Sequence, residues 1–160
     1  MAINANGKIQ NVKASLEKYI GDNLVITEGL TMDFEGKPFE GTGLAEWIEE
    51  RILGSGSRDF HRQVSSLTMG QTTQLLVNFN IFVNPDMTTK TNRHYEIRDI
   101  VADYFKIGTQ IDLYDFSDSD WTTSLQKMEV REIITDRTIP DPNFSMYSFT
   151  VGISWLESWQ

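Results

Sequence analysis

The chain has 160 residues, 39% of them hydrophobic, and this length and composition are typical of one globular domain with a single core. Its 14 Lys and Arg against 23 Asp and Glu give a formal net charge of −9, which disfavours direct binding to nucleic acid because phosphate contacts need clustered basic side chains. The absence of cysteine excludes disulfides, thiol nucleophiles and thiolate metal sites.

No run of about 18 apolar residues that could span a bilayer occurs in the sequence. The first ten residues, MAINANGKIQ, lack the basic-then-apolar pattern of a secretory signal. We therefore expect a soluble protein that is intracellular when it is made. The acidic residues are dispersed and 11% of the chain is aromatic, which indicates a folded acidic surface rather than a disordered acidic tail.

The first third of the chain predicts a helix followed by two strands. Apolar residues three and four apart predict an amphipathic helix over Asn4–Gly21, with the glycine as its end. A β-branched pair predicts a first strand over Leu24–Phe34, before a turn-rich connection. In Leu44–Leu53, LAEWIEERIL, the apolar residues fit one face of a helix or of a strand, and we favour the strand.

The middle of the chain predicts a loop, a central strand and a second helix. The segment Gly54–Asp59, GSGSRD, is rich in glycine and serine and predicts a flexible loop. Alternating apolar residues predict a strong central strand over Thr73–Val83. A broad apolar face predicts a helix over Thr89–Ile107, ended by Gly108, and Thr109–Phe116 predicts a short strand.

The chain closes with a predicted long hairpin, Leu125–Thr138 and Phe144–Trp155 around the turn IPDPN. In the last strand apolar residues alternate with small ones, so that one face is buried and the other is nearly bare. The order of elements predicts a single α+β domain over residues 1–160, with two main helices packed on one face of a mostly antiparallel sheet. Long hairpin strands also offer edges to a neighbouring subunit.

Candidate chemical features are few. His61 and His94 are the only histidines, and an enzyme that used either one would need the fold to bring a carboxylate beside it. The acidic run Asp112–Asp120 lacks the spacing, glycine and distal glutamate of a calcium loop, so it is typical of a solvated turn. GSGSRD matches neither glycine-rich phosphate-binding motif. We therefore predict a protein that is not an enzyme, with no catalytic residues, metal ligands or cofactor.

Tryptophans at the ends of predicted elements serve either as lids on the core or as anchors of an interface. For Trp47 and Trp155 we favour packing against the core. For Trp159, close to the C-terminus, contact with a partner fits equally well.

The layout resembles the tail terminator proteins of long-tailed bacteriophages, the lambda-like siphophages in particular. The element order carries the resemblance, together with Glu46, Trp47 and Ile48 in a strand after the first helix, a Gly/Ser/Arg-rich loop and the helix pattern YEIRDIVADYF. It spans nearly the whole chain and contains no diagnostic motif.

That resemblance implies a structural virion protein that caps the head-proximal end of the phage tail tube as a hexameric ring. The ring ends tube polymerisation and provides the head-joining surface. The implied partners are further copies of the chain, the tail tube protein and a head-completion or connector protein, with the virion tail as location and the host cytoplasm during assembly. DNA passes through without specific binding and no membrane is involved. The alternatives are a related neck protein or a cytosolic protein-binding module.

A closed ring requires two different, complementary patches on each subunit. We expect the loop GSGSRDF and the connection Asn84–Lys90, NPDMTTK, to make contacts. We also expect acidic residues in the lumen, which repel DNA. The candidate interface residues are Arg58, Asp59, Phe60, Asp86, Lys90 and Trp159.

Overall fold

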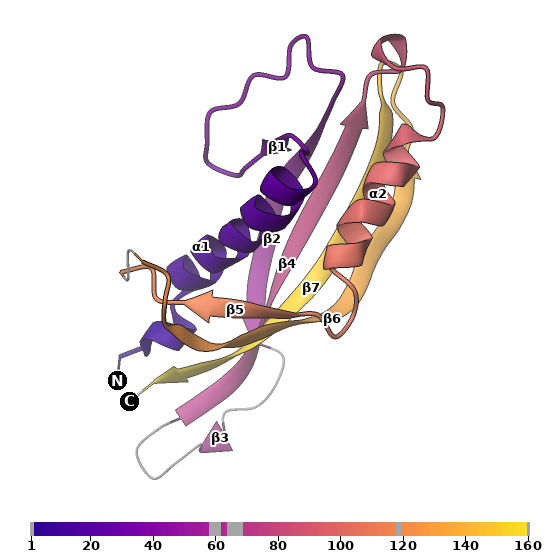
Figure 1. Cartoon of the computed structure of the whole chain (residues 1–160). Coiled ribbons are helices and arrows are strands. Elements are labelled where there is room, and N and C mark those ends of the chain that lie inside the picture. The colour runs from indigo at the N-terminus through magenta and orange to yellow at the C-terminus, as the bar shows by residue number, and fades with distance from the viewer. Residues whose placement is uncertain (1, 58–61, 64–68, 118–119, 160) are drawn as a thin grey trace.

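The computed structural model describes residues 2–57, 62–63, 69–117 and 120–159. Within them, two helices lie in front of a long, twisted sheet, and the two ends of the chain lie close together at one corner (Figure 1). The elements are η1 (Ala5–Gly7), α1 (Ile9–Ile20), η2 (Gly21–Thr27), β1 (Met32–Asp33), β2 (Glu46–Ser57), β3 (Arg62–Gln63), β4 (Met69–Val83), η3 (Pro85–Met87), α2 (Arg93–Tyr104), β5 (Gln110–Tyr114), β6 (Ser124–Ile139) and β7 (Ser145–Trp159).

The strands form one sheet in the order β1, β2, β4, β7, β6, β5, with β3 paired to β4. The short β1 runs parallel to β2, and the other described pairs are antiparallel. In Figure 1, β5 and the start of β6 run across the lower part of the other long strands. The predicted α+β fold with a mostly antiparallel sheet and a long C-terminal hairpin is therefore confirmed.

The core lies between the helices and the sheet. Helix α1 contributes the fully buried Val12, Leu16 and Ile20, which are four residues apart and so share one side of the helix. Strands β4 and β7 supply the facing layer, because every second side chain of each points to this side of the sheet. The buried apolar residues of these strands are Leu75, Val77, Phe79, Ile81, Val83, Tyr147, Phe149, Val151, Ile153 and Trp155.

The predicted strand Leu24–Phe34 is wrong. Residues Gly21–Thr27 form a π-helix that continues α1, and strand structure is limited to Met32–Asp33. Gly21 has helical dihedrals and does not end the helix. Leu24 extends the buried apolar stripe of α1 by one more turn, so tertiary packing overrides the strand preference of the β-branched residues that follow it. The chain turns instead at Gly29, which has the left-handed φ of +71°.

The predicted loop Gly54–Asp59 is also partly wrong, because Gly54–Ser57 belong to β2 and pair with β4. The backbone hydrogen bonds to β4 offset the conformational entropy that these glycine and serine residues lose when they become ordered. Arg58 and Asp59 lie outside the described residues.

The predicted segment Leu44–Leu53 is a strand from Glu46 onward, and the central strand and the hairpin are present and longer than predicted. The first helix begins at Ile9, later than predicted, and runs on through the π-helix to Thr27, whereas the second helix is shorter than predicted. Helix α2 begins at Arg93, after a turn, and ends at Tyr104. Gly108, with a left-handed φ of +92°, then directs the chain into β5.

The outer face of the sheet, away from the helices, carries short polar side chains at its centre. Asn78 donates to the hydroxyl groups of Ser148, at 2.9 Å, and Thr150, at 2.7 Å. Next to them Gln74 reaches across β7 and donates to the Glu132 carboxylate at 2.6 Å. It passes directly over Gly152, where an added Cβ would lie 2.3 Å from the Gln74 amide nitrogen.

Gly152→Ala should therefore destabilise the protein by about 1 to 2 kcal/mol, because the Gln74 amide must move and lose its bond to a charged acceptor. Gly21→Ala is the matched control: it has helical dihedrals and open space around its Cβ position, so we expect about 0.5 to 1 kcal/mol of stabilisation. Urea unfolding of both variants measures the two opposite signs. Equal stability of Gly152→Ala and the natural protein would contradict this account.

Candidate functional site

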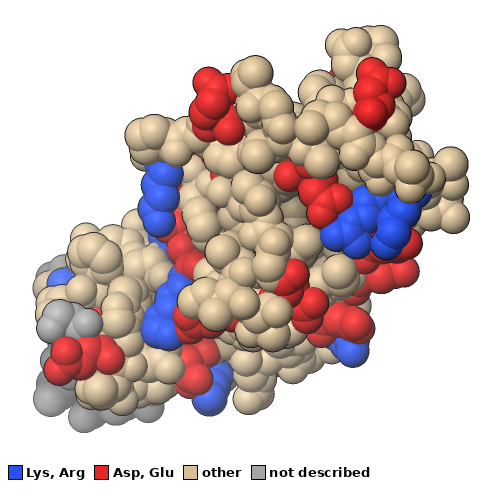
Figure 2. Space-filling view, turned by 45° about the horizontal axis from the view of Figure 1, so that its top comes forward, with Lys and Arg blue, Asp and Glu red and all other residues tan. Residues whose placement is uncertain are grey.

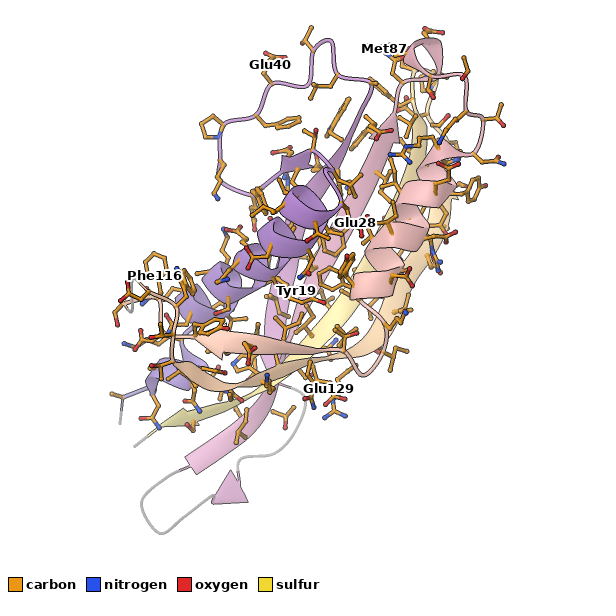
Figure 3. All side chains as sticks on the ribbon, in the orientation of Figure 1. Tyr19, Glu28, Glu40, Met87, Phe116 and Glu129 are labelled. Carbon is orange, nitrogen blue, oxygen red and sulfur yellow. The ribbon has the colours of Figure 1, made fainter. Side chains whose placement is uncertain are left out.

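One end of the molecule is built from the connections between long strands, and two predicted interface residues lie there. Asp86 and Lys90 are exposed in the segment after β4, whose tip carries Met87 (Figure 3). Asn84 accepts the Asp86 N–H at 3.0 Å, and the Lys90 ammonium lies 3.3 Å from the Glu96 carboxylate. These contacts hold the segment in a defined shape at the surface.

An aromatic cluster supports this end on the outer face of the sheet. Trp47 stacks on Phe82 with ring centroids 4.9 Å apart and meets the edge of Phe144 at 5.3 Å. Phe39, from the connection between β1 and β2, lies 6.1 Å from Trp47. The half-buried Trp47 thus ties three chain segments together, which agrees with a packing role, although on the outer face rather than in the core.

The remaining predicted interface residues are not brought to this end. Arg58, Asp59 and Phe60 lie outside the described residues. The backbone of Trp159 pairs with Met69 at the far end of the β4–β7 ladder, and the Trp159 side chain lies outside the described part of the chain. The described candidates therefore occupy opposite ends of the long strands.

Sequence reasoning expected long hairpin strands to offer edges, but it did not locate the two open lateral edges of the sheet. Strand β5 pairs with β6 only as far as Glu129, and the Val130 backbone makes the last bonds, to Gly108 and Thr109. From Arg131 to Ile139, β6 has β7 on one side and, among the described residues, no strand on the other. About half of this 16-residue strand is thus an open edge.

The opposite edge is the second half of β2. Strand β1 pairs with β2 only at Ile48 and Glu49, and the Glu35 carboxylate accepts the Ile52 N–H at 3.3 Å. From Leu53 to Ser57, β2 pairs with β4 on one side and, within the described ranges, with no strand on the other.

Both open edges carry exposed aliphatic side chains at a β-bulge. Leu53, 60% exposed, is the extra residue of a bulge in β2, and Ile134, 47% exposed, is the extra residue of a bulge in β6. Each directly follows a residue of one cross-strand row, which runs through Ile52, Val77, Val151 and Ile133. Because β2 and β6 run in opposite directions, the two exposed residues lie just to either side of this row, on opposite edges of the sheet. The sequence signal was a broken alternation, with apolar residues adjacent at 52–53 and 133–134.

A groove of about 430 Å³ runs beside the β6 edge, between that strand and α2. Ala102, Ile107 and Ile133 give it an apolar lining, and Ile107 is 63% exposed. Arg98 holds α2 against β6 through two hydrogen bonds to the Asp136 carboxylate, which also accepts the hydroxyl of Tyr147 at 2.6 Å. This pairing lowers the pKa of Asp136.

A buried carboxyl group lies next to the β2 edge. The Glu50 side chain is fully buried, with one oxygen accepting the Glu35 N–H at 3.1 Å and the other without a hydrogen-bond partner in the described structure. Burial, helped by the charges of Glu17 and Glu35, raises the pKa of Glu50 to about 7 against the lowering effects of the Glu35 N–H and Lys13.

Of the two histidines, His94 lies within the described residues. His61 lies outside the described residues, and burial lowers the pKa of His94, whose ring packs 4.3 Å from that of Tyr95. In the described ranges no group of three or more His, Asp or Glu is arranged to hold a metal ion. On the face drawn in Figure 2, acidic and basic side chains are interspersed over a largely uncharged surface. None of the helices in the described ranges is long and apolar enough to cross a bilayer.

Comparison with known proteins identifies the fold but no family. No protein-family model matches the chain, and no curated protein matches it. A solved structure that carries no functional name is similar over 92% of this chain and 94% of its own, with a TM-score of 0.60 and 9% sequence identity. At this identity the similarity shows a shared fold alone.

The buried Glu50 predicts a pH dependence of stability. Its folded-state pKa of about 7 exceeds the ordinary value of 4.5, so its charged form opposes folding. The contribution is most favourable below pH 4.5, is lost as the pH rises through 7, and costs about 3 kcal/mol at alkaline pH. Glu50→Gln should therefore be up to about 3 kcal/mol more stable than the natural protein at pH 8.5 and similar at pH 5.

Denaturant unfolding of both proteins from pH 5 to pH 8.5 measures this difference. Glu40→Gln is the control, because Glu40 is exposed and a hydrogen bond to Thr42 lowers its pKa, so that it titrates below this range. A difference between Glu50→Gln and the natural protein that does not change with pH would contradict the assignment.

Proposed function

We propose that this chain is a structural subunit that closes into a ring and terminates a bacteriophage tail tube. The proposal is supported by the resemblance of the sequence to siphophage tail terminators and by an α+β fold with open lateral edges. It assigns the chain a role in assembly rather than in catalysis.

The observation that carries the proposal is the pair of open edges on opposite sides of one sheet, Leu53–Ser57 of β2 and Arg131–Ile139 of β6. An unpaired strand edge presents backbone donors and acceptors that another strand can satisfy. Two different edges on one subunit favour head-to-tail association, which gives a ring when the rotation between subunits closes.

If the lateral edges form the ring, the two ends of the long strands face the partners that lie above and below the ring along its axis. We propose that the end with Asp86 and Lys90 contacts either the tail tube protein or a head-completion protein, and that the end with Trp159 contacts the other. The net charge of −9 supports passage of DNA without specific binding, because like charges repel within about 8 to 10 Å at physiological salt.

The test is the assembly state of the purified protein. We expect light scattering over a wide concentration range to give a mass several times the 18.3 kDa of one chain, and negative-stain images of the same fractions to show closed rings with a central hole. A protein that stays monomeric at every concentration contradicts spontaneous ring formation and favours a module that captures a peptide at its sheet edge. Rings that fail to cap purified tail tubes would favour a neck protein of similar fold.

A further inference from the structure

We infer that the ring contact joins the β2 edge of one copy to the β6 edge of the next, with Leu53 of the first copy against Ile133 and Ile134 of the second. This inference rests on the proposed ring and names the surfaces that form it. The occupant of the groove between α2 and β6 is therefore a second copy of this chain.

The backbone supplies the first argument. The open stretches of the two edges meet at the row of Ile52 and Ile133, from which that of β2 extends in one direction along the sheet and that of β6 in the other. In the part of β2 that precedes Leu53, the edge is blocked by the short β1 and by the Glu35 carboxylate, which accepts the Ile52 N–H. In the part of β6 that precedes Arg131, the edge is blocked by β5 and by the backbone hydrogen bonds of Val130 to Gly108 and Thr109. With a shift of about one to two residues between neighbouring copies, the backbone of residues 53–56 of one copy can pair with that of residues 131–134 of the next.

Strand direction supplies the second argument. Because β2, β4, β7 and β6 alternate in direction, β2 and β6 run opposite ways within one subunit. Two copies placed side by side with the same polarity therefore bring these edges together antiparallel, which is the more stable way to pair. Since the open stretches meet at one cross-strand row, a shift of only about one to two residues along the strands separates neighbours, and we propose that the rotation between them closes the ring.

The apolar side chains supply the third argument. Leu53 is 60% exposed, and the groove beside β6 offers it Ile133, Ala102 and Ile107. In the isolated subunit these aliphatic groups face water on two separate edges. The proposed contact covers both sets at once, as the hydrophobic effect favours.

The absence of cysteine makes a disulfide test possible, because introduced thiols are the only ones in the protein. Leu53→Cys and Ile134→Cys are purified separately, mixed in equal amounts, allowed to exchange subunits and oxidised. We expect the mixture to form covalent dimers at least ten times more than either variant alone, because a disulfide needs Cα atoms within about 7 Å. The variant carrying both substitutions should give a ladder of covalent oligomers.

Two further mixtures of cysteine variants serve as controls for random cross-linking and for the register of the contact. Ile26→Cys with Leu53→Cys reports random collision, since Ile26 is 76% exposed and lies in η2, away from either edge. Thr138→Cys with Leu53→Cys tests the register, because Thr138 lies on the same edge about 13 Å from Ile134. Neither should cross-link above background.

A sample that forms rings but gives no excess of 53–134 cross-links overturns the edge contact and leaves the ring proposal standing. Preferred 53–138 cross-links overturn the register, and efficient self-linking of either single variant indicates a two-fold contact instead. A sample without oligomers and without cross-links up to millimolar concentration overturns both proposals.

Leu53→Lys provides a second measurement without cysteine chemistry. Because Leu53 is exposed, we expect an unchanged circular dichroism spectrum and thermal midpoint for the subunit, but at least a tenfold weaker association by light scattering. Ile26→Lys is the matched control and should associate normally. Normal association of Leu53→Lys would overturn the contact.

Discussion

The ladder between β4 and β7 is the interaction on which the rest of the structure depends. It runs from the pair Met69 and Trp159 to the pair Val83 and Ser145. The other described strands of the sheet lie on either side of it, beyond β4 or beyond β7. Its strict alternation makes one face apolar, which receives α1 and α2, and leaves short polar side chains at the centre of the other face. Because β2 and β6 flank this ladder, the open edges of the sheet are set by how far their outer neighbours extend.

Those outer neighbours are short, and this is what gives the subunit its assembly potential. Strand β1 has two residues and β5 has five, whereas β2 and β6 have 12 and 16. An open strand edge of this kind promotes aggregation unless it is protected, and β-bulges are one form of protection. The bulges at Leu53 and Ile134 restrict the regular stretch of each edge, which favours one defined partner over uncontrolled pairing.

The buried Glu50 stands apart from this architecture, because a carboxyl group on the core face of β2 weakens the domain when it is charged. Its neighbour Glu35 both donates its N–H to Glu50 and caps the β2 backbone at Ile52. The connection after β1 is thereby attached to the strand just before its open edge begins. Because the pKa of Glu50 is raised, we expect the stability of this corner to depend on pH.

The sequence by itself determined the α+β class, the central strand, the hairpin and the buried face of β7, because alternation in such long strands has one interpretation. It also determined the acidic charge and the absence of thiol chemistry. Tertiary structure alone decided that residues 21–27 continue α1, since Leu24 is buried only when α1 meets the sheet, and that Gly54–Ser57 are ordered, since their partner β4 begins 12 residues later. The open edges also depend on pairing between distant segments. No local pattern states how far a neighbouring strand extends, so the candidate interface at Leu53 and Ile134 emerged only from the folded chain.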